Sequence, residues 1–357
     1  MGTISRLSRD IASANNYRIY VPFSVKDSTS TFIDCYTPST NSWHRATSIP
    51  QYCQSLVLKD FSMVSIGHHI YIIGGRLCRK ATEHDEAGVA QGTNPMVVPF
   101  VWRYNVRTNN WDTCSPMATS RSDFACTVSN NKIYVAGGKS TLGGAKGISS
   151  AEVYDPASDQ WKSLAHMSTM RYKCVAVTWL GKVHIVGGFV DDGENQGPYL
   201  TSRSSAEAYD AEHDKWDFKA RMWDLDVPPN QIISINGKLF SCGDCFIPWK
   251  GHIEAYDEQE NIWNILCGSY YHCLSPTSTP EVTGPPMQRL YLTMAPIGNM
   301  LYFLTGYRIS GNVSRLQSQV HVFDTAFNGT GWQSLDPIDE EGDKELCGHG
   351  CVLKYDS

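Results

Sequence analysis

The sequence predicts an all-β protein assembled from repeats of a four-stranded unit, and three observations lead to this fold class. The first is an aromatic pair that recurs about every 50 residues, a period that is typical of repeat architectures. In the first five pairs a Tyr stands seven residues before a Trp, and in the sixth a Phe stands nine before it. The pairs are Tyr36/Trp43, Tyr104/Trp111, Tyr154/Trp161, Tyr209/Trp216, Tyr256/Trp263 and Phe323/Trp332.

The second observation is a short apolar run that ends in small residues ahead of each later pair. Clear copies occupy 70–75, 133–138 and 183–188, and degraded copies occupy 239–244 and 301–306. Alternating polarity and β-branched or aromatic content predict buried strands. The terminal glycines supply the positive φ that a sharp turn at the end of each strand requires.

The third observation is another apolar run in front of each of these strands. The run at 124–128 is an example, and the tight turn at 129–131 joins it to the strand that follows. Together with the two strands that carry the aromatic pair, this gives four strands in each unit. We label them A to D in chain order.

These residues resemble the Kelch-repeat family, whose hallmarks are a double glycine followed by a Tyr and a Trp at this spacing. The resemblance covers residues 17 to 355 and implies a β-propeller, with four antiparallel strands in each blade, around a channel. Six aromatic pairs imply six blades, numbered here by the pair that each contains. We therefore interpret 1–357 as a single Kelch propeller domain, with 1–17 as an N-terminal extension and 18–357 as the six blades.

Blade 1 indicates how such a ring closes. Its strand B is recognisable at 18–21, but no strand A precedes it, and Phe23 and Ser24 stand where the glycines are expected. At the other end, 350–354 resembles a strand A with no strand B after it. We expect the C-terminal strand to complete blade 1, because this pairs two edges that would otherwise stay open.

The composition indicates a protein without a nucleic-acid or membrane partner. The net charge is −6 and 18% of the residues are charged, which gives no polybasic surface for nucleic acid or anionic lipid. No apolar stretch approaches the roughly 20 residues of a membrane span, and no secretory leader is recognisable. We expect a monomer in the cytoplasm, with the nucleus as a further compartment.

Twelve cysteines in such a compartment are expected to be reduced. Cys242 and Cys245 have CxxC spacing, and Cys347, His349 and Cys351 are three further ligand types. The register places Cys242 in a strand B and Cys351 in the closing strand, so nothing brings the two groups together. We predict no metal and no cofactor.

One acid–base cluster, at 83–86, lies in the long blade-2 segment and contains His84 among carboxylates. A His in that setting is suited to act as a base or a metal ligand. The alternative is a solvated charge run on a mobile loop, because Ala and Gly residues follow it.

The repeated tryptophans are assigned to packing between blades. A ligand needs a site once, whereas a repeated core needs its anchor in every blade, and each buried ring removes about 150–250 Å² from water. Function is therefore expected where the repeats differ. The longest connections are 76–103, 189–208, 267–288 and 307–322, and in an antiparallel blade all of them lie on one face.

Three arginines stand at the same register on that face, at the start of a strand A. They are Arg121, Arg171 and Arg289. Converging guanidiniums can grip a carboxylate or phosphate in a bidentate manner. The alternative is that the arginine belongs to the repeat itself and binds a neighbouring backbone carbonyl. The other candidate ligand- or partner-binding residues are Asp123, Tyr172, Lys173, Tyr291, Asp226 and Asn230.

The mixture of aromatic and charged groups suits a protein or peptide partner, including an acidic one, or a small polar or anionic ligand. The family resemblance implies a recognition module of scaffold or substrate-receptor type. Plant-type relatives join an F-box to the Kelch ring, but only about 17 residues precede the first strand here, so neither an F-box nor a BTB domain is expected.

The second functional class is an enzyme or a product-specifying protein that uses a pocket at the same channel mouth. Kelch-type relatives include epimerases, a copper oxidase and nitrile-specifier proteins. Glu207, Asp210 and His213 are spaced more closely than the iron motif of the specifiers and fall on the opposite face. An activity here is expected to be that of a cofactor-independent isomerase, cyclase or lyase, and its catalytic residues are unknown.

The closure of the ring is testable by truncation. Deletion of 346–357 removes the strand that is expected to complete blade 1, so we expect the whole protein to unfold cooperatively. Circular dichroism melting curves of the full chain and the truncated chain measure this. An unchanged curve for the truncated chain would contradict the proposed closure.

Overall fold

The computed structural model describes residues 14–25, 30–51, 56–79, 96–143, 146–189, 203–266, 287–310, 314–326 and 331–355. The regular structure of these residues consists of antiparallel strands and one short 3-10 helix, η1, at Ala14–Asn16. None of the described helical segments is long and apolar enough to cross a membrane. The all-β class predicted from the repeat pattern is confirmed.

Within the described residues, six sheets of four or five strands follow one another along the chain. Sheet 1 contains β1 (Tyr17–Val25), β2 (Thr31–Thr37), β3 (Ser42–Ser48), β28 (Lys344–Leu346) and β29 (Cys351–Lys354). Sheet 2 contains β5 (Ser62–Ile66), β6 (His69–Ile73), β9 (Val101–Asn105) and β10 (Asn110–Cys114). Sheet 3 contains β11 (Ala125–Ser129), β12 (Lys132–Ala136), β13 (Ala151–Asp155) and β14 (Gln160–Leu164).

Sheets 4 to 6 continue the same order. Sheet 4 contains β15 (Val175–Trp179), β16 (Lys182–Val186), β17 (Ala206–Asp210) and β18 (Lys215–Lys219). Sheet 5 contains β19 (Ile232–Ile235), β20 (Lys238–Ser241), β21 (Glu254–Asp257) and β22 (Ile262–Ile265). Sheet 6 contains β23 (Met287–Ile297), β24 (Met300–Ile309), β25 (Arg315–Asp324), β26 (Trp332–Ser334) and β27 (Ile338–Asp339).

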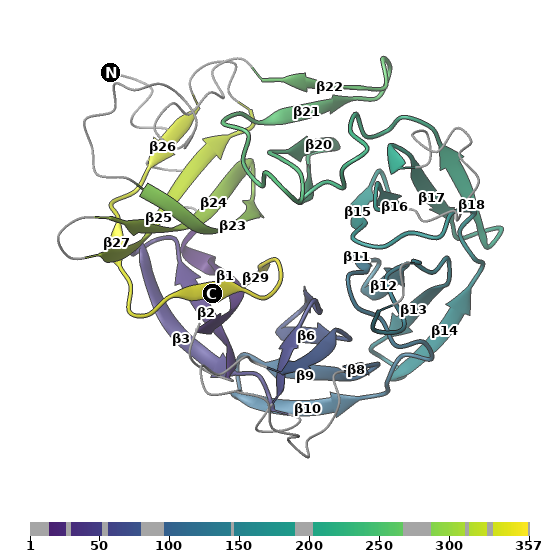
Figure 1. Ribbon diagram of the computed structural model, residues 1–357, viewed down its shortest axis with the longest axis horizontal. Coiled ribbons are helices and arrows are strands. Elements are labelled where there is room, and N and C mark those ends of the chain that lie inside the picture. The colour runs from purple at the N-terminus through teal and green to yellow at the C-terminus, as the bar shows by residue number, and fades with distance from the viewer. Residues whose placement is uncertain are drawn as a thin grey trace.

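The six sheets stand side by side around a common centre (Figure 1). The first strand lies innermost in sheets 2 to 6, whereas β29 takes that place in sheet 1, where it pairs with β1. Strands β5, β11, β15, β19 and β23 contact one another in turn, and β29 contacts both β5 and β23. The hydrophobic core is divided among the interfaces between neighbouring sheets. One cluster, for example, joins Ala136 of sheet 3 to Ile185 of sheet 4, and another joins Phe23 of sheet 1 to Tyr302 of sheet 6.

The aromatic pairs lie at these interfaces. Each Tyr or Phe is directly opposite its Trp on the neighbouring strand, as Tyr154 is opposite Trp161, with ring centroids 5.0 Å apart. The hydroxyl of Tyr154 donates a hydrogen bond to Asp159 (2.7 Å), which has a φ of 52° in the turn between β13 and β14. The Trp161 Nε1–H donates to the carbonyl of Ser115 in the preceding sheet (2.8 Å). The repeated tryptophans therefore tie each sheet to its neighbour.

The two ends of the chain meet in sheet 1. Strand β29 pairs antiparallel with β1, with Tyr17 opposite Lys354 and Tyr20 opposite Cys351. The preceding strand β28, which the sequence pattern did not indicate, pairs with the other half of β1, where Phe23 is opposite Leu346. Strand β1 is long enough to pair with both because it continues through Phe23 and Ser24, where the other units turn.

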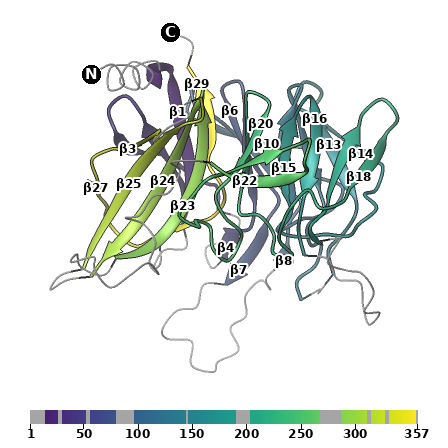
Figure 2. The ribbon, with the colours of Figure 1, turned by 90° about the horizontal axis from the view of Figure 1, so that it is seen from above.

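The lengthened connections are only in part loops, which corrects one expectation. Most of 307–322 is the continuation of β24 and β25 as a paired hairpin, with Ile309 opposite Arg315. In the segment 76–103, β7 (Arg76–Arg79) and β8 (Met96–Val97) join β4 (Leu56–Lys59) in a three-stranded sheet. This small sheet projects from one side of the disc (Figure 2). The cluster at 83–86 and most of the two other long segments lie outside the described residues.

Sheet 6 provides a test of packing at an interface. A Cβ at Gly306 would lie 2.0 Å from the ring of Tyr291, so we expect Gly306→Ala to lower the free energy of unfolding by about 3 kcal/mol through overpacking. Urea unfolding measures this. The matched control is Gly298→Ala, because Gly298 has a φ of 58° and open space around it. We expect about 1 kcal/mol there from backbone strain alone. Equal losses in the two variants would contradict the packing argument.

Candidate functional site

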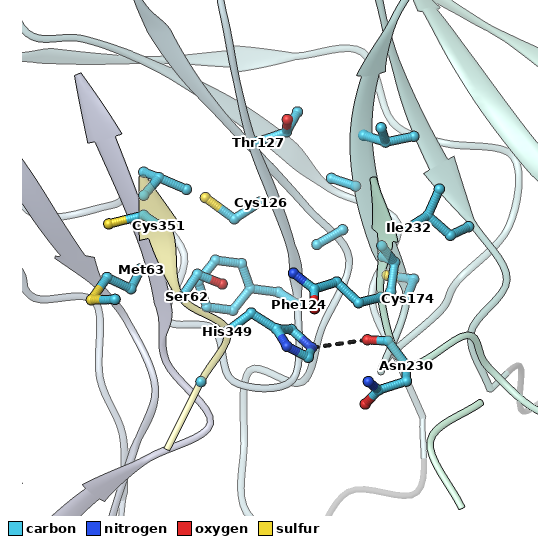
Figure 3. A pocket seen from close by; sticks show the side chains of 18 of the residues that line it. Ser62, Met63, Phe124, Cys126, Thr127, Cys174, Asn230, Ile232, His349 and Cys351 are labelled. Atoms are coloured by element: carbon cyan, nitrogen blue, oxygen red, sulfur yellow. Dashed lines mark hydrogen bonds between the residues drawn. The ribbon is translucent and has the colours of Figure 1, made fainter. Parts of the chain in front are cut away.

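A channel of about 630 Å³ runs through the centre of the described structure. The innermost strands β5, β11, β15 and β19 line it, together with the segment that leads into β29. Side chains from these strands point into it, among them Ser62, Cys126 and Thr127 (Figure 3). The channel therefore presents hydroxyl, thiol and apolar groups, with charged groups gathered at one mouth.

The charged mouth is built by residues at equivalent positions in sheets 2, 3 and 4. Asp60, Asp123 and Lys173 each have a φ between 51° and 54°, a left-handed conformation that Asp tolerates better than most residues. The backbone N–H of Asp123 donates to the carbonyl of Asp60 (3.3 Å), and that of Lys173 donates to the carbonyl of Asp123 (2.7 Å). These bonds cross from sheet to sheet and fix the three side chains along the mouth.

The carboxylates at this mouth are in different states. Asp60 forms an ion pair with Arg76 at the start of β7. Burial, and then the nearby charge of Asp60, raises the pKa of Asp123, although Lys173, Arg76 and Lys139 act in the opposite direction. Burial therefore disfavours the charged form of the Asp123 side chain.

The segment before β29 reaches across the channel. His349 Nε2–H donates to the backbone carbonyl of Asn230 (2.9 Å), as the dashed line in Figure 3 shows, and Nδ1 lies 3.5 Å from the hydroxyl of Thr293. Burial lowers the pKa of His349. A neutral ring that donates at Nε2 and accepts at Nδ1 satisfies both contacts. His349 thus connects sheet 1 to sheets 5 and 6.

Arg121 and Arg171 are fully buried and bound within their own sheets. The Nη1 group of Arg171 donates to the carbonyls of Gly187 (2.8 Å) and Ser205 (3.2 Å). Its Nη2 group bonds the hydroxyl of Ser205 and the carboxylate of Glu207 (3.0 Å). Arg121 makes the same four contacts in sheet 3, with Glu152 as its carboxylate. This is the structural role that the sequence left open as the alternative to ligand binding.

The backbone of each of these arginines also holds the preceding sheet. The carbonyl of Arg171 accepts a hydrogen bond from the N–H of Gly138 (2.8 Å), and a Cβ at Gly137 would lie 2.6 Å from that oxygen. The double glycine is therefore required for the close approach of two sheets as well as for the turn. Neither guanidinium has a terminal nitrogen available at the channel mouth.

The other predicted residues separate into two groups. Asp123, Lys173 and Asn230 line the channel mouth together. Tyr291 is buried against Phe23 and donates its hydroxyl to Glu340 (2.8 Å), whereas Asp226 is exposed on the approach to β19. Arg289 is partly exposed near the start of β23 and does not line the channel.

A row of three aromatic side chains lies on the same face, and the sequence had indicated only the first of them, Tyr172. Tyr172 contacts Phe189 (ring centroids 5.5 Å apart), and Phe189 contacts Phe246 (6.1 Å). We call these three residues the aromatic row. Lys139 Nζ lies 4.0 Å from the centre of the Tyr172 ring. Phe246 and the adjacent Ile247 are 69% and 54% exposed, so the row ends in an apolar tip in solvent.

Local geometry explains how the tip is presented. The carboxylate of Asp244 accepts hydrogen bonds from the backbone N–H groups of Phe246 (2.9 Å) and Ile247 (2.8 Å). This Asx turn uses the polar side chain to hold the backbone and leaves the two apolar side chains outside. The signal in the sequence was two large apolar residues within a turn that begins Cys-Gly-Asp.

The cysteine groupings do not form a metal site in the described part of the chain. No group of three His, Cys, Asp or Glu side chains there is arranged to hold an ion. The thiol of Cys242 donates to the carbonyl of Pro248 (3.1 Å), and burial raises the pKa of this thiol to about 12. A thiol in this state is a structural hydrogen-bond donor rather than a thiolate ligand.

Comparison with known proteins gives a consistent result. A sequence model of the Kelch motif matches residues 120–168. An F-box/kelch-repeat protein of Arabidopsis thaliana is 25% identical over 231 residues, which are 64% of this chain and 55% of that protein. Another F-box/kelch-repeat protein of that plant is 31% identical over 199 residues, 54% of this chain and 42% of that protein.

An animal protein is also similar. Kelch repeat and BTB domain-containing protein 12 of Homo sapiens is 24% identical over 255 residues, which are 66% of this chain and 39% of that protein. This chain thus spans between about two fifths and just over half of the length of these three relatives.

The buried arginines make a direct stability prediction. Arg171→Met is expected to lower the free energy of unfolding by about 3–5 kcal/mol, because it leaves the buried carboxylate of Glu207 without its cation. Chemical denaturation measures the loss. Arg315→Met is the matched control, since Arg315 is exposed on β25 and its loss is expected to cost less than about 0.5 kcal/mol. A similar small cost for both variants would refute the structural role.

The raised pKa of Asp123 predicts a pH dependence. The folded state holds this proton more tightly than the unfolded chain, so the protein loses stability as the pH rises from the usual value of 3.8 through the raised folded value. Asn is neutral at every pH, so the Asp123→Asn variant does not lose this stability. We expect the stability of this variant relative to the wild type to increase as the pH rises from 3.8 through the raised pKa of Asp123, as measured by urea unfolding at a series of pH values. A pH-independent difference would contradict this assignment.

Proposed function

Since the chain belongs to the Kelch-repeat family, we propose that its six sheets are the blades of one propeller domain, closed by β29, whose channel-mouth face binds a protein partner. Residues 18–357 form the ring in this proposal, and the domain acts as a monomeric recognition module of scaffold or substrate-receptor type. Kelch repeats commonly mediate protein–protein interaction, which supports the general class. The names of the relatives add an F-box or a BTB domain to their repeats, and the proposal concerns the Kelch part alone.

The observation that carries the proposal is the aromatic row. Exposed aromatic side chains that are fixed in position are enriched among the residues that dominate binding energy, because they bury a large area with little loss of side-chain entropy. Phe246 and Ile247 are exposed at the end of the row and are held there by an Asx turn. Apolar side chains that are exposed and held in a fixed position are more typical of a surface that contacts a partner than of a loop surrounded by water.

The charges beside the row favour an acidic partner. Lys139 lies against Tyr172, and Lys173 is exposed at the mouth. Among the described residues neither ammonium group forms an ion pair, whereas Asp60 is paired with Arg76 and Asp123 is half-buried. The accessible charge along the row is therefore positive. An acidic segment of a partner is drawn to such a surface and fixed in register by it.

A second candidate function, the binding of a small polar molecule, is favoured by the channel itself. Its volume of about 630 Å³ falls within the range of about 300–1,000 Å³ that is usual for ligand sites. It differs from the pocket that the sequence suggested, because Arg121, Arg171 and Arg289 do not line it. The groups that could contact a ligand are the hydroxyls and thiols along the channel, with Asp123, Lys173 and His349 at its mouth.

The proposed function is tested by comparing two surface substitutions. Phe246→Asp places a charge at the end of the aromatic row, and Phe218→Asp places one on the outer strand β18, where Phe218 is 48% exposed. Proteins that co-purify with the wild type from native cell extract are quantified by mass spectrometry. We expect Phe246→Asp to lose the specific partners, with at least a tenfold decrease in recovery, which corresponds to about 1.4 kcal/mol.

The control keeps the result interpretable. Phe218→Asp carries the same change in charge and apolarity and is expected to recover the same partners as the wild type. Identical partner sets for all three proteins would show that the aromatic row does not bind the partner. Loss of partners by Phe218→Asp alone would move the interface to the outer edge.

A further inference from the structure

The carboxylate partner of the repeated arginine is missing from one sheet. Glu152 and Glu207, which bind Arg121 and Arg171, each stand two residues before the Tyr of an aromatic pair. In sheet 6 this position is His321, although Arg289 keeps the arginine. Sheets 2 and 5 have Leu58 and Val227 in place of the arginine, and sheet 2 also has Trp102 in place of the Glu. Sheet 6 thus retains the cation without the anion.

His321 does not replace the missing charge. Its Nδ1 lies 2.9 Å from the hydroxyl of Ser334, and burial lowers its pKa to about 4. The ring is therefore neutral near pH 7. A neutral imidazole supplies no counter-charge to a guanidinium, so the exchange of Glu for His removes an ion pair that sheets 3 and 4 retain.

Within the described ranges Arg289 forms no ion pair with a carboxylate, unlike Arg121 and Arg171. Its Nη1 atom is buried and has no hydrogen-bond partner in the described part of the chain. Burial lowers the pKa of this guanidinium, opposed by Tyr307 and Cys242. An arginine nevertheless stays protonated at neutral pH, because the ordinary pKa of a guanidinium lies far above neutral. A desolvated cation without an anion is unfavourable, and an incoming carboxylate relieves this cost.

Arg289 also differs from the two buried arginines in access. Both of those have fully buried side chains, whereas Arg289 is partly exposed. Strand β23 places it opposite Tyr307, next to a bulge between Arg289 and Tyr291. In sheets 2, 3 and 4 the corresponding end of the sheet carries the charged residues of the channel mouth. Cys242, whose thiol is close enough to affect the guanidinium, begins the turn that carries Phe246.

We propose that Arg289 is the anchor for a carboxylate side chain of the protein partner, which binds it as Glu152 and Glu207 bind the arginines of sheets 3 and 4. This inference rests on the proposed function and names the chemistry of the partner. The partner segment carries an apolar side chain for the aromatic row and a Glu or Asp for Arg289. The internal pairs give the expected N···O distance of 2.8–3.0 Å. In sheet 6 the carboxylate oxygen accepts from Nη1, the atom that has no partner among the described residues.

Peptide selection tests this directly. A random dodecapeptide library is selected on the wild-type chain, and the recovered peptides are synthesised with each acidic residue either retained or changed to its amide. We expect one acidic residue to be required. We expect Arg289→Met, which keeps the apolar stem of the side chain, to raise the Kd of the acidic peptide at least about tenfold in fluorescence polarisation. Arg289→Lys is expected to give a smaller increase, because it keeps the charge and loses the forked geometry.

The controls separate the possible failures. Arg315→Met, on strand β25 of the same sheet, is expected to bind as the wild type does. If Arg289→Met leaves the Kd unchanged while Phe246→Asp abolishes binding, the carboxylate anchor is refuted and the proposed docking face stands. If neither variant changes the Kd, both proposals fail.

Thermal denaturation distinguishes an anchor from a structural arginine. Arg289→Met should leave the melting temperature within about 1 °C of the wild type, because no internal pair is broken. A decrease as large as that of Arg171→Met would overturn the proposal. Glu281→Gln is measured in parallel, since Glu281 precedes β23 outside the described residues. An equal decrease in melting temperature for Arg289→Met and Glu281→Gln would show that the chain supplies its own carboxylate, which also overturns it.

Discussion

The rest of the structure depends on the contact between each aromatic pair and the sheet before it. In sheets 3, 4 and 5 the Tyr hydroxyl donates to a left-handed Asn or Asp in the turn, the Trp ring packs against the Tyr, and the indole N–H donates to a carbonyl of the preceding sheet, as in Tyr154, Trp161 and Ser115. The same arrangement recurs at Tyr209 and Trp216. A sheet of four short strands cannot bury both of its faces alone, so these contacts between neighbours hold the ring together.

The buried arginines add a polar connection to the apolar one. Arg171 binds two carbonyls, a hydroxyl and Glu207 in its own sheet, while its backbone accepts a hydrogen bond from Gly138 of the sheet before. Such a group is fixed by the fold and has nothing left for a ligand. Recognition is instead assigned to side chains that depart from the repeat: the aromatic row with its exposed tip at Phe246, and Arg289, whose carboxylate partner has become His321. Repetition stabilises the scaffold, and the exceptions to it are available for function.

Much of the fold was predictable because it is periodic. The aromatic pairs, the double glycines and the turn at 129–131 each encode a local conformation, and their recurrence indicated the sheets.

The candidate site was less predictable. The register predicted that Asp123, Lys173 and Asn230 lie at the mouth. It also predicted the same role for Arg121 and Arg289, because a shared register position does not reveal which arginine has a carboxylate beside it in space. Phe189 and Phe246 were missed because their contact joins two sheets that are distant in sequence. The hairpin of β24 and β25 looked like a loop because Gly306 predicted the end of a strand, whereas β24 continues through it to Ile309.

The central claim is that the repeated arginines are already bound within the fold, whereas Arg289 awaits its carboxylate. Nuclear magnetic resonance of the arginine side chains, with assignments made by single substitution, measures this most directly. Arg121 and Arg171 should give slowly exchanging terminal N–H signals with restricted rotation in the free protein. Arg289 should give such signals only when an acidic peptide is added. Slow exchange at Arg289 in the free protein, at the level of the other two, would contradict the account.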